Sequence, residues 1–136
     1  MSKSNTTEND FMLYTFNGTA FSWNGNTNLY LSLHTADPGE GGNQTTSEAT
    51  YTSYARVTVA RTSGGFTVSG NQASNTALVQ FPQCTGGSNV ITHVAVGTAA
   101  SGTGQILYSG ALTASLSVSS GIQPQFGVGA FVVTED

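Results

Sequence analysis

Strict alternation of apolar and polar side chains is the feature that most limits what this chain can fold into. In the stretch "LYLSLH" (29–34), leucines alternate with Tyr30, Ser32 and His34. A period of two puts the two sets of side chains on opposite faces of a β-strand, whereas apolar residues of an amphipathic helix recur every three or four positions. The same alternation returns at 54–61, 90–97 and 112–118. The alternation therefore predicts a chain built mainly from half-buried strands.

Glycine-rich segments separate these stretches at short intervals. Further strands are expected at 64–71, 75–82, 104–110 and 112–121 and in the closing segments "IQPQF" and "AFVVTED". About eight or nine short strands punctuated by glycine are typical of sandwiches and barrels. No internal repeat or linker is visible, and 136 residues are enough for one core. We expect an all-β fold, an antiparallel jelly-roll-like sandwich or barrel, as a single domain over 1–136.

One helix is expected near the start, at about residues 7–16 within an N-terminal arm of 1–18. Thr7 or Asn9 could cap it, since side chains of this kind accept hydrogen bonds from the first free backbone N–H groups. Asn17 followed by Gly18 is a stop signal. Such a helix could close one end of the sandwich or dock on a partner.

A long polar loop is expected over 36–53. Asp37, Pro38 and Gly39 carry the residue types of a tight turn, in the order that such a turn requires. The following residues, 40–52, contain few apolar side chains, and we expect them to be mobile. Glu48 could pair with Arg56 or Arg61, and an exposed pair of this kind contributes at most about 1 kcal/mol.

Composition excludes several functions. Only 7% of residues are charged and the net charge is −4, so the clustered Lys and Arg that nucleic acid requires are missing. No apolar run reaches the roughly 20 residues that span a bilayer, and no secretion signal is expected. We expect neither a nucleic-acid nor a membrane partner.

The residues with catalytic or metal-binding chemistry are few and scattered. Cys84 is the single cysteine, so no disulfide is possible within the chain, and we expect a filler or loop residue rather than a nucleophile. A metal site from His34, Asp37 and His93 is sterically conceivable, but their spacing is a weak signal. No base, orienting group and nucleophile lie together in the sequence. We expect no enzyme activity, no metal and no cofactor.

Plentiful aromatic residues on a nearly uncharged chain predict contacts with partners. Such a surface favours self-association, and we expect a dimer more than a trimer because two-fold pairing is the commonest symmetry. The candidate interface residues are aromatic or belong to the few charged side chains, types favoured at interface hot spots. They are Phe11, Tyr14, Trp23, Glu48, Tyr51, Tyr54, Arg56 and Arg61.

Several segments resemble a family of small tailed-phage structural proteins. They are "LYLSLHTADPGEGG", "SEATYTSYARVTVAR", "SNTALVQFP", "THVAVGTAASGTGQILYSGAL" and "GIQPQFGVGAFVVTED", which together span nearly the whole chain. The chain looks most like the capsid cement (decoration) proteins of short-tailed phages. The resemblance implies a jelly-roll-type fold, no catalysis, self-association and binding to the major capsid protein across the outer seams of the phage head. The expected location is the outer capsid surface of the virion, after synthesis in the host cytoplasm.

Two other functions stay open. A tail or fibre component would share the fold and the low charge. A carbohydrate-binding or hydrolytic jelly roll would need clustered carboxylates or exposed aromatic rings, and nothing pairs Asp37, Glu40 and Glu48 as acid and nucleophile.

Overall fold

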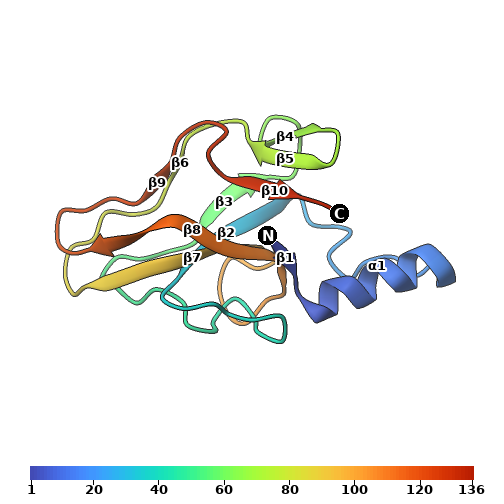
Figure 1. The fold of residues 1–136 in the computed structure, drawn as a ribbon, viewed down its shortest axis with the longest axis horizontal. Helices are drawn as coiled ribbons and strands as arrows, with labels where there is room; N and C mark the ends of the chain where they lie inside the picture. The colour runs from blue at the N-terminus through green and yellow to red at the C-terminus, as the bar shows by residue number, and fades with distance from the viewer.

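Antiparallel β-sheets form the body of the protein, and one helix stands off from it (Figure 1). The computed structural model describes residues 1–136. The largest sheet has five strands in the order β1 (Ser2–Lys3), β8 (Ile106–Val118), β7 (Asn89–Gly97), β2 (Asn28–His34) and β3 (Val57–Ala60). A second sheet runs β10 (Val132–Thr134), β5 (Gln72–Asn75) and β4 (Phe66–Ser69), and β6 (Val79–Gln80) pairs with β9 (Gln125–Phe126). The prediction of an all-β antiparallel fold with one short N-terminal helix is confirmed.

Several strand boundaries differ from the prediction, and β3 and β4 are shorter than the strands expected at 54–61 and 64–71. The segments 104–110 and 112–121 form one strand, β8, which runs without a turn through Gly110 and pairs with β7 across an irregularity between Ile91 and His93. The segment 75–82 is instead interrupted after Asn75. The Asn75 side chain donates to the carbonyl oxygen of Ala77 (2.8 Å) and accepts from the N–H of Phe131 (2.9 Å). These bonds hold the chain in a turn, so only Val79–Gln80 pairs as a strand.

The core lies on one face of β2, between the large sheet and the smaller ones. Leu31 and Leu33 are 0% and 1% exposed and belong to one buried cluster with Phe131 and with Val133 of β10. The cluster also takes in Ala49 and Tyr51 from the segment that follows β2. Alternation along β2 therefore predicted the core-facing leucines correctly.

The segment 36–53 contains no named strand or helix, and parts of it pack closely against the sheet. Gln44, Ala49 and Tyr51 are at most 5% exposed, and Glu48 forms an isolated bridge with His34. Asp37 does begin a turn, because its Oδ1 accepts from the N–H of Gly39 (2.9 Å), where the chain has a φ of 71°. The segment covers the second face of β2 near its end, so Ser32 and His34 are buried as well, whereas Tyr30 is half-buried.

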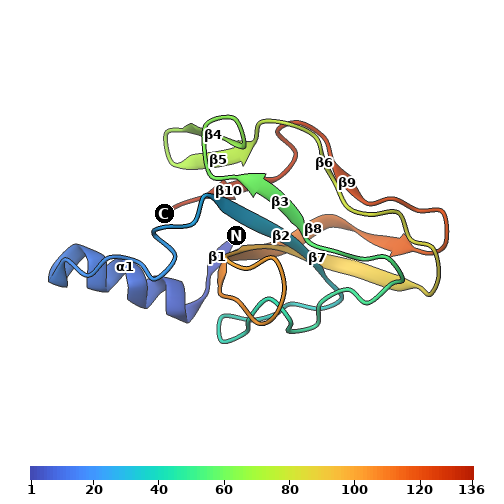
Figure 2. The same cartoon turned by 180° about the vertical axis from the view of Figure 1, so that it is seen from behind.

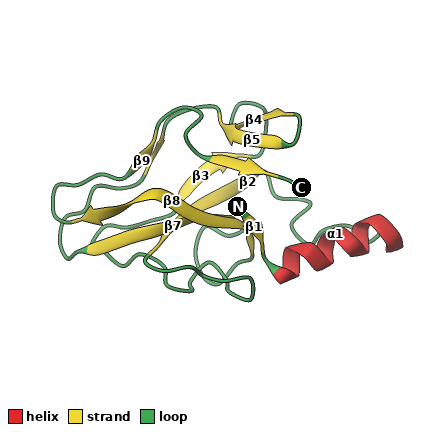
Figure 3. Cartoon of the chain, viewed as in Figure 1, coloured by secondary structure: helices red, strands yellow, loops and turns green.

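The helix α1 (Asn5–Asn17) begins earlier than predicted. Ser4, rather than Thr7 or Asn9, caps it, because the Ser4 Oγ accepts from the N–H of Thr7 (3.2 Å). Gly18 ends it in the left-handed region, as expected from the stop signal. Figures 2 and 3 show that α1 extends away from the sheets instead of closing one end of the sandwich. Neither the length nor the apolar content of any helix here is sufficient to cross a membrane.

Candidate interaction surface

The helix and the loop that follows it form an arm, residues 5–27, outside the β-sheets. One face of α1 packs on this loop, where the ring of Phe21 stacks on Tyr14 (5.0 Å between centroids) and meets Phe11 edge-on (5.2 Å). Phe21 in turn stacks on Trp23, with centroids 4.6 Å apart and planes 5° apart. Offset or edge-on aromatic pairs contribute about 0.5–1.5 kcal/mol each beyond the area they bury. The arm is therefore held by its own row of aromatic rings.

Polar bonds tie the base of the arm to the body. Hydroxyl groups of Ser4 and Thr7 both donate to the carbonyl oxygen of Ile106, at 2.6 and 2.9 Å. Asp10 accepts from Gln105 Nε2 (2.7 Å) and, more weakly, from Trp23 Nε1 (3.4 Å). These bonds fix the direction in which α1 leaves the sheets.

The opposite face of α1 carries apolar side chains that nothing covers. Met12 and Phe16, one turn apart, are 59% and 74% exposed, and Leu13 lies beside them at intermediate exposure. Tyr14, on the flank, is 56% exposed. Uncovered apolar side chains that lie together on a surface and are rimmed by polar residues are typical of interaction sites. The outer face of α1 therefore has the character of a surface that meets a partner.

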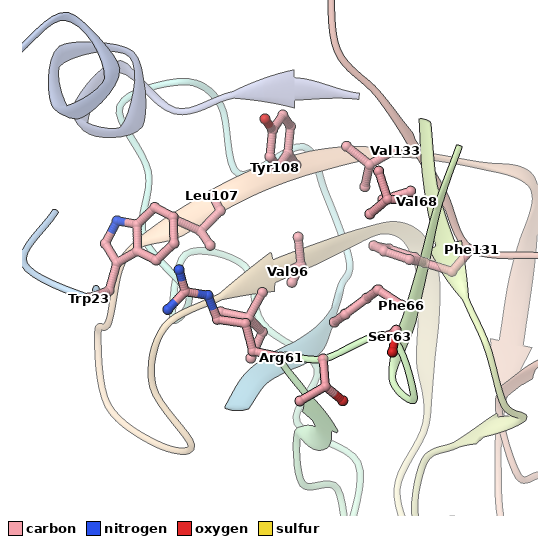
Figure 4. A pocket seen from close by; sticks show the side chains of 13 residues that line it. Trp23, Arg61, Ser63, Phe66, Val68, Val96, Leu107, Tyr108, Phe131 and Val133 are labelled. Atoms are coloured by element: carbon pink, nitrogen blue, oxygen red, sulfur yellow. The ribbon is translucent and has the colours of Figure 1, made fainter. Parts of the chain in front are cut away.

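An apolar pocket of about 490 Å³ opens at the end of the sheets beside the arm. Ten of its 13 lining residues are hydrophobic, and they come from both sheets and from the arm. In Figure 4, Val96 and Leu107 on one side face Phe66 and Phe131 on the other, with Trp23 at the edge. Because the row of stacked rings ends at Trp23, the pocket and the arm form one continuous apolar surface.

Arg61 is the one charged residue that lines the pocket, and it binds groups of the arm loop. Its guanidinium group stacks over Trp23 (5.0 Å to the centroid), and its Nη1 donates to the carbonyl oxygens of Asn24 (2.9 Å) and Asn26 (3.1 Å). Arg61 thus holds the arm loop against β3 and does not pair with Glu48.

Glu48 pairs with Arg56, and the pair is buried. Arg56 Nε and Nη2 donate to the two carboxylate oxygens at 2.7 and 2.9 Å, and Tyr54 also donates to Glu48 (2.8 Å). The side chains of Arg56 and Glu48 are only 3% and 15% exposed. The expectation of an exposed pair is therefore wrong, because the segment 36–53 folds over the site. Burial and the nearby Glu48 carboxylate raise the pKa of Tyr54 well above its usual range.

The buried face of β2 contains a Ser–His pair that resembles part of a catalytic triad. His34 Nδ1 lies 2.8 Å from the carbonyl oxygen of Thr46, so it carries the proton, and Nε2 accepts from Ser32 Oγ at 2.8 Å. Both side chains are 0% exposed, which leaves no path for a substrate. Desolvation lowers the pKa of His34 from 6.5, against the smaller opposing effects of Thr46 and Glu48. The pair therefore holds β2 to the covering segment as a neutral hydrogen-bonded unit.

The three residues considered for a metal site do not come together as ligands. His34 and His93 are cross-strand partners, but both ring nitrogens of His34 are already hydrogen-bonded. No group of three His, Cys, Asp or Glu side chains has a geometry that could hold a metal ion. Cys84 is buried, where its thiol donates to the carbonyl oxygen of Gly86 (3.1 Å).

The structure divides the eight candidate interface residues into two groups. Phe11, Tyr14, Trp23 and Arg61 gather in the arm and at the pocket. The other four bind one another or the core, in the network around Glu48: Glu48, Tyr51, Tyr54 and Arg56. Their role at an interface stays a prediction, and the arm group offers the more accessible surface.

Three further residues of this surface are not among the eight predicted interface residues: Met12, Phe16 and Phe21. The sequence does indicate Phe16, because with Phe11, Leu13 and Tyr14 it gives the expected helix a broad apolar face. Met12 and Phe21 have no such signal in the sequence, since the contacts between the helix and the loop after it place them.

Comparison with known proteins changes the functional interpretation. A family model described as "Podophage GP4 fiber I protein gp80" matches residues 2–134. No curated protein sequence matches the chain. The identification as a capsid cement protein is therefore wrong, and so are the major capsid protein as its partner and the outer capsid surface as its place in the virion. The protein is a structural component of the bacteriophage virion, and it belongs to the podophage GP4 fiber I protein gp80 family.

Proposed function

We propose that this protein is a non-catalytic structural subunit of the tail fibre of a short-tailed phage. The observation that carries the proposal is the match to the fiber I family over residues 2–134. A fibre subunit has to bind other subunits along a thin structure. It therefore needs apolar surfaces that stay exposed until the subunits assemble. The uncovered outer face of α1 and the open pocket are surfaces of this kind.

The absence of catalysis is part of the proposal. The Ser–His pair on β2 is fully buried, and a substrate could reach it only after the covering segment 36–53 had unfolded. The apolar pocket beside the arm contains no carboxylate. Asp37 and Glu40 do lie together with His93 in a separate polar hollow of about 620 Å³, but no Phe, Tyr or Trp ring lines it. Neither hollow combines carboxylates with aromatic rings, which argues against the carbohydrate-binding alternative.

Labelling of intact particles tests the proposal. Antibodies raised against the purified chain are applied to phage particles, with antibody pre-adsorbed on the same protein as the control. Cryo-electron microscopy or gold labelling should place the signal on fibres at the tail. Signal spread evenly over the head, with none at the tail, would contradict the proposal.

A further inference from the structure

Two apolar features of the chain are uncovered at the same end of the molecule. One is the outer face of α1, with Met12, Leu13 and Phe16, and the other is the pocket between the sheets, whose lining Figure 4 shows. A projecting group and a cavity of the same chemistry within one chain are complementary.

The dimensions of the two features agree. A cavity of about 150 Å³ can hold a benzene ring. The pocket of about 490 Å³ therefore has room for the ring of Phe16 together with the side chain of Met12. The one charge on this side of α1 is Glu8, which lies one turn before Met12, toward the base of the helix and away from its tip. The one charge in the pocket lining is Arg61, whose guanidinium group already stacks on Trp23.

The helix cannot fill the pocket of its own chain in this conformation. Ser4 and Thr7 anchor its base to Ile106, and its inner face packs on Phe21. The outer face is consequently turned away from Trp23 and from the pocket beside it.

We propose that the tip of α1 from one copy fills the apolar pocket of a second copy, in a closed assembly that leaves no pocket empty. The inference rests on these side chains alone and holds wherever in the particle the chain resides. The occupant needs no other protein, because each copy supplies both the projecting side chains and the cavity.

The buried area explains why the assembly closes. A Phe or Tyr side chain can bury about 150–250 Å². With Met12 taken at the low end of this range, the half to three quarters exposed on Met12, Tyr14 and Phe16 amounts to roughly 300–400 Å² per arm. With the matching pocket surface, one contact buries about 700 Å², less than the roughly 1,200–2,000 Å² of a stable interface. In a two-fold dimer both contacts lie in the same interface, which then buries about 1,400 Å² and falls in that range.

Sedimentation and tryptophan fluorescence of the full chain test the proposal together. Trp23 is the single tryptophan and lies at the pocket, so its emission reports whether the pocket is filled. The double variant Met12→Ser, Phe16→Ser removes only exposed side chains and should leave the fold intact. The matched control is Val128→Ser, which is 70% exposed and lies outside the arm and the pocket.

The wild-type chain and Val128→Ser should associate as the concentration rises, with a blue shift of Trp23 emission over the same range. The double variant should associate about 100-fold more weakly or not at all, because two hot-spot side chains are lost. Val68→Lys, at the rim of the pocket, should have the same effect without touching α1. A wild-type chain that stays monomeric would overturn the proposal, whether its emission remains that of an open pocket or is already blue-shifted at every concentration.

Discussion

The buried Glu48–Arg56 pair allows the most direct test of how this fold is stabilised. Replacing Glu48 by Gln preserves the shape of the side chain but leaves the Arg56 guanidinium group, 3% exposed, without a counter-charge. Glu48 accepts three hydrogen bonds, from Tyr54 and from two nitrogens of Arg56, and Arg56 also donates to the carbonyl oxygens of Ala99 (2.9 Å) and Gly102 (2.6 Å). The pair thus joins the covering segment to the loop after β7.

Removing one partner of a buried pair costs about 3–5 kcal/mol, whereas an exposed pair contributes at most about 1 kcal/mol. We expect Glu48→Gln to lower the free energy of unfolding by about 3–5 kcal/mol. In urea, this corresponds to a midpoint lower by about 2 M for a domain of this size. Equilibrium unfolding followed by far-ultraviolet circular dichroism measures the change.

Two further variants distinguish a buried charge from a general packing defect. Glu40→Gln changes an exposed carboxylate and should stay within about 0.5 kcal/mol of the wild type. The double variant Glu48→Leu, Arg56→Met should cost less than Glu48→Gln alone, because it leaves no charge buried. A loss below about 1 kcal/mol for Glu48→Gln would refute this reasoning and show that water reaches the pair.

Three other perturbations test the core and the packing around β2. Because the pKa of His34 is lowered in the folded state, the free energy of unfolding should fall as the pH drops below 6.5, by up to about 1.4 kcal/mol per pH unit, while the contribution is fully present above that pH. His34→Gln should remove this slope between pH 6.5 and 5 in urea titrations, and an unchanged slope would assign it to another group. Phe81 is 0% exposed and lies between Tyr54 and Phe126, so Phe81→Ala should lower the free energy of unfolding by about 3–5 kcal/mol, measured by calorimetry. Leu78, at 49% exposure, gives the control variant Leu78→Ala, which should lower it far less. Equal losses of stability would contradict the placement of the core. In Gly97→Ala the new Cβ would lie 2.3 Å from Gln44 Cδ, so we expect the free energy of unfolding to fall by about 1–3 kcal/mol. Adding Gln44→Ala in the same chain should remove most of the destabilisation caused by Gly97→Ala. Strictly additive losses in this double-mutant cycle would show that Gln44 is not the obstacle.

Alternation predicted the strands well because it depends on local geometry alone. The leucines of β2 face the core as the period of two requires. The same pattern could not show that Ser32 and His34 are also buried, since their cover comes from residues 36–53, which fold back over the strand. From sequence alone, the polar face of a strand is interpreted as exposed to solvent, because the distant segment that covers it cannot be identified.

The start of α1 shows the same limit on a smaller scale. Ser4, Thr7 and Asn9 can all cap a helix, so local chemistry does not decide among them. Ser4 is the cap because its hydroxyl group also reaches the carbonyl oxygen of Ile106, 102 positions along the chain. The contact that selects the cap is tertiary, and no window of neighbouring residues contains it.

The contacts of the three basic side chains link the fold to its proposed role. Each of the three is engaged within the chain: Lys3 with Glu135, Arg56 with Glu48, and Arg61 with Trp23 and the carbonyl groups of the arm loop. The basic side chains thus hold segments of the chain together, and they are not free to bind a partner. The exposed charges that remain are carboxylates such as Glu8, Asp37 and Glu40, and the assembly proposed above uses instead the apolar side chains on α1 and around the pocket. Contacts made by such groups are largely insensitive to salt, because screening acts on exposed charges. A chain of this kind is suited to lasting contacts in a particle that meets variable ionic conditions outside the host.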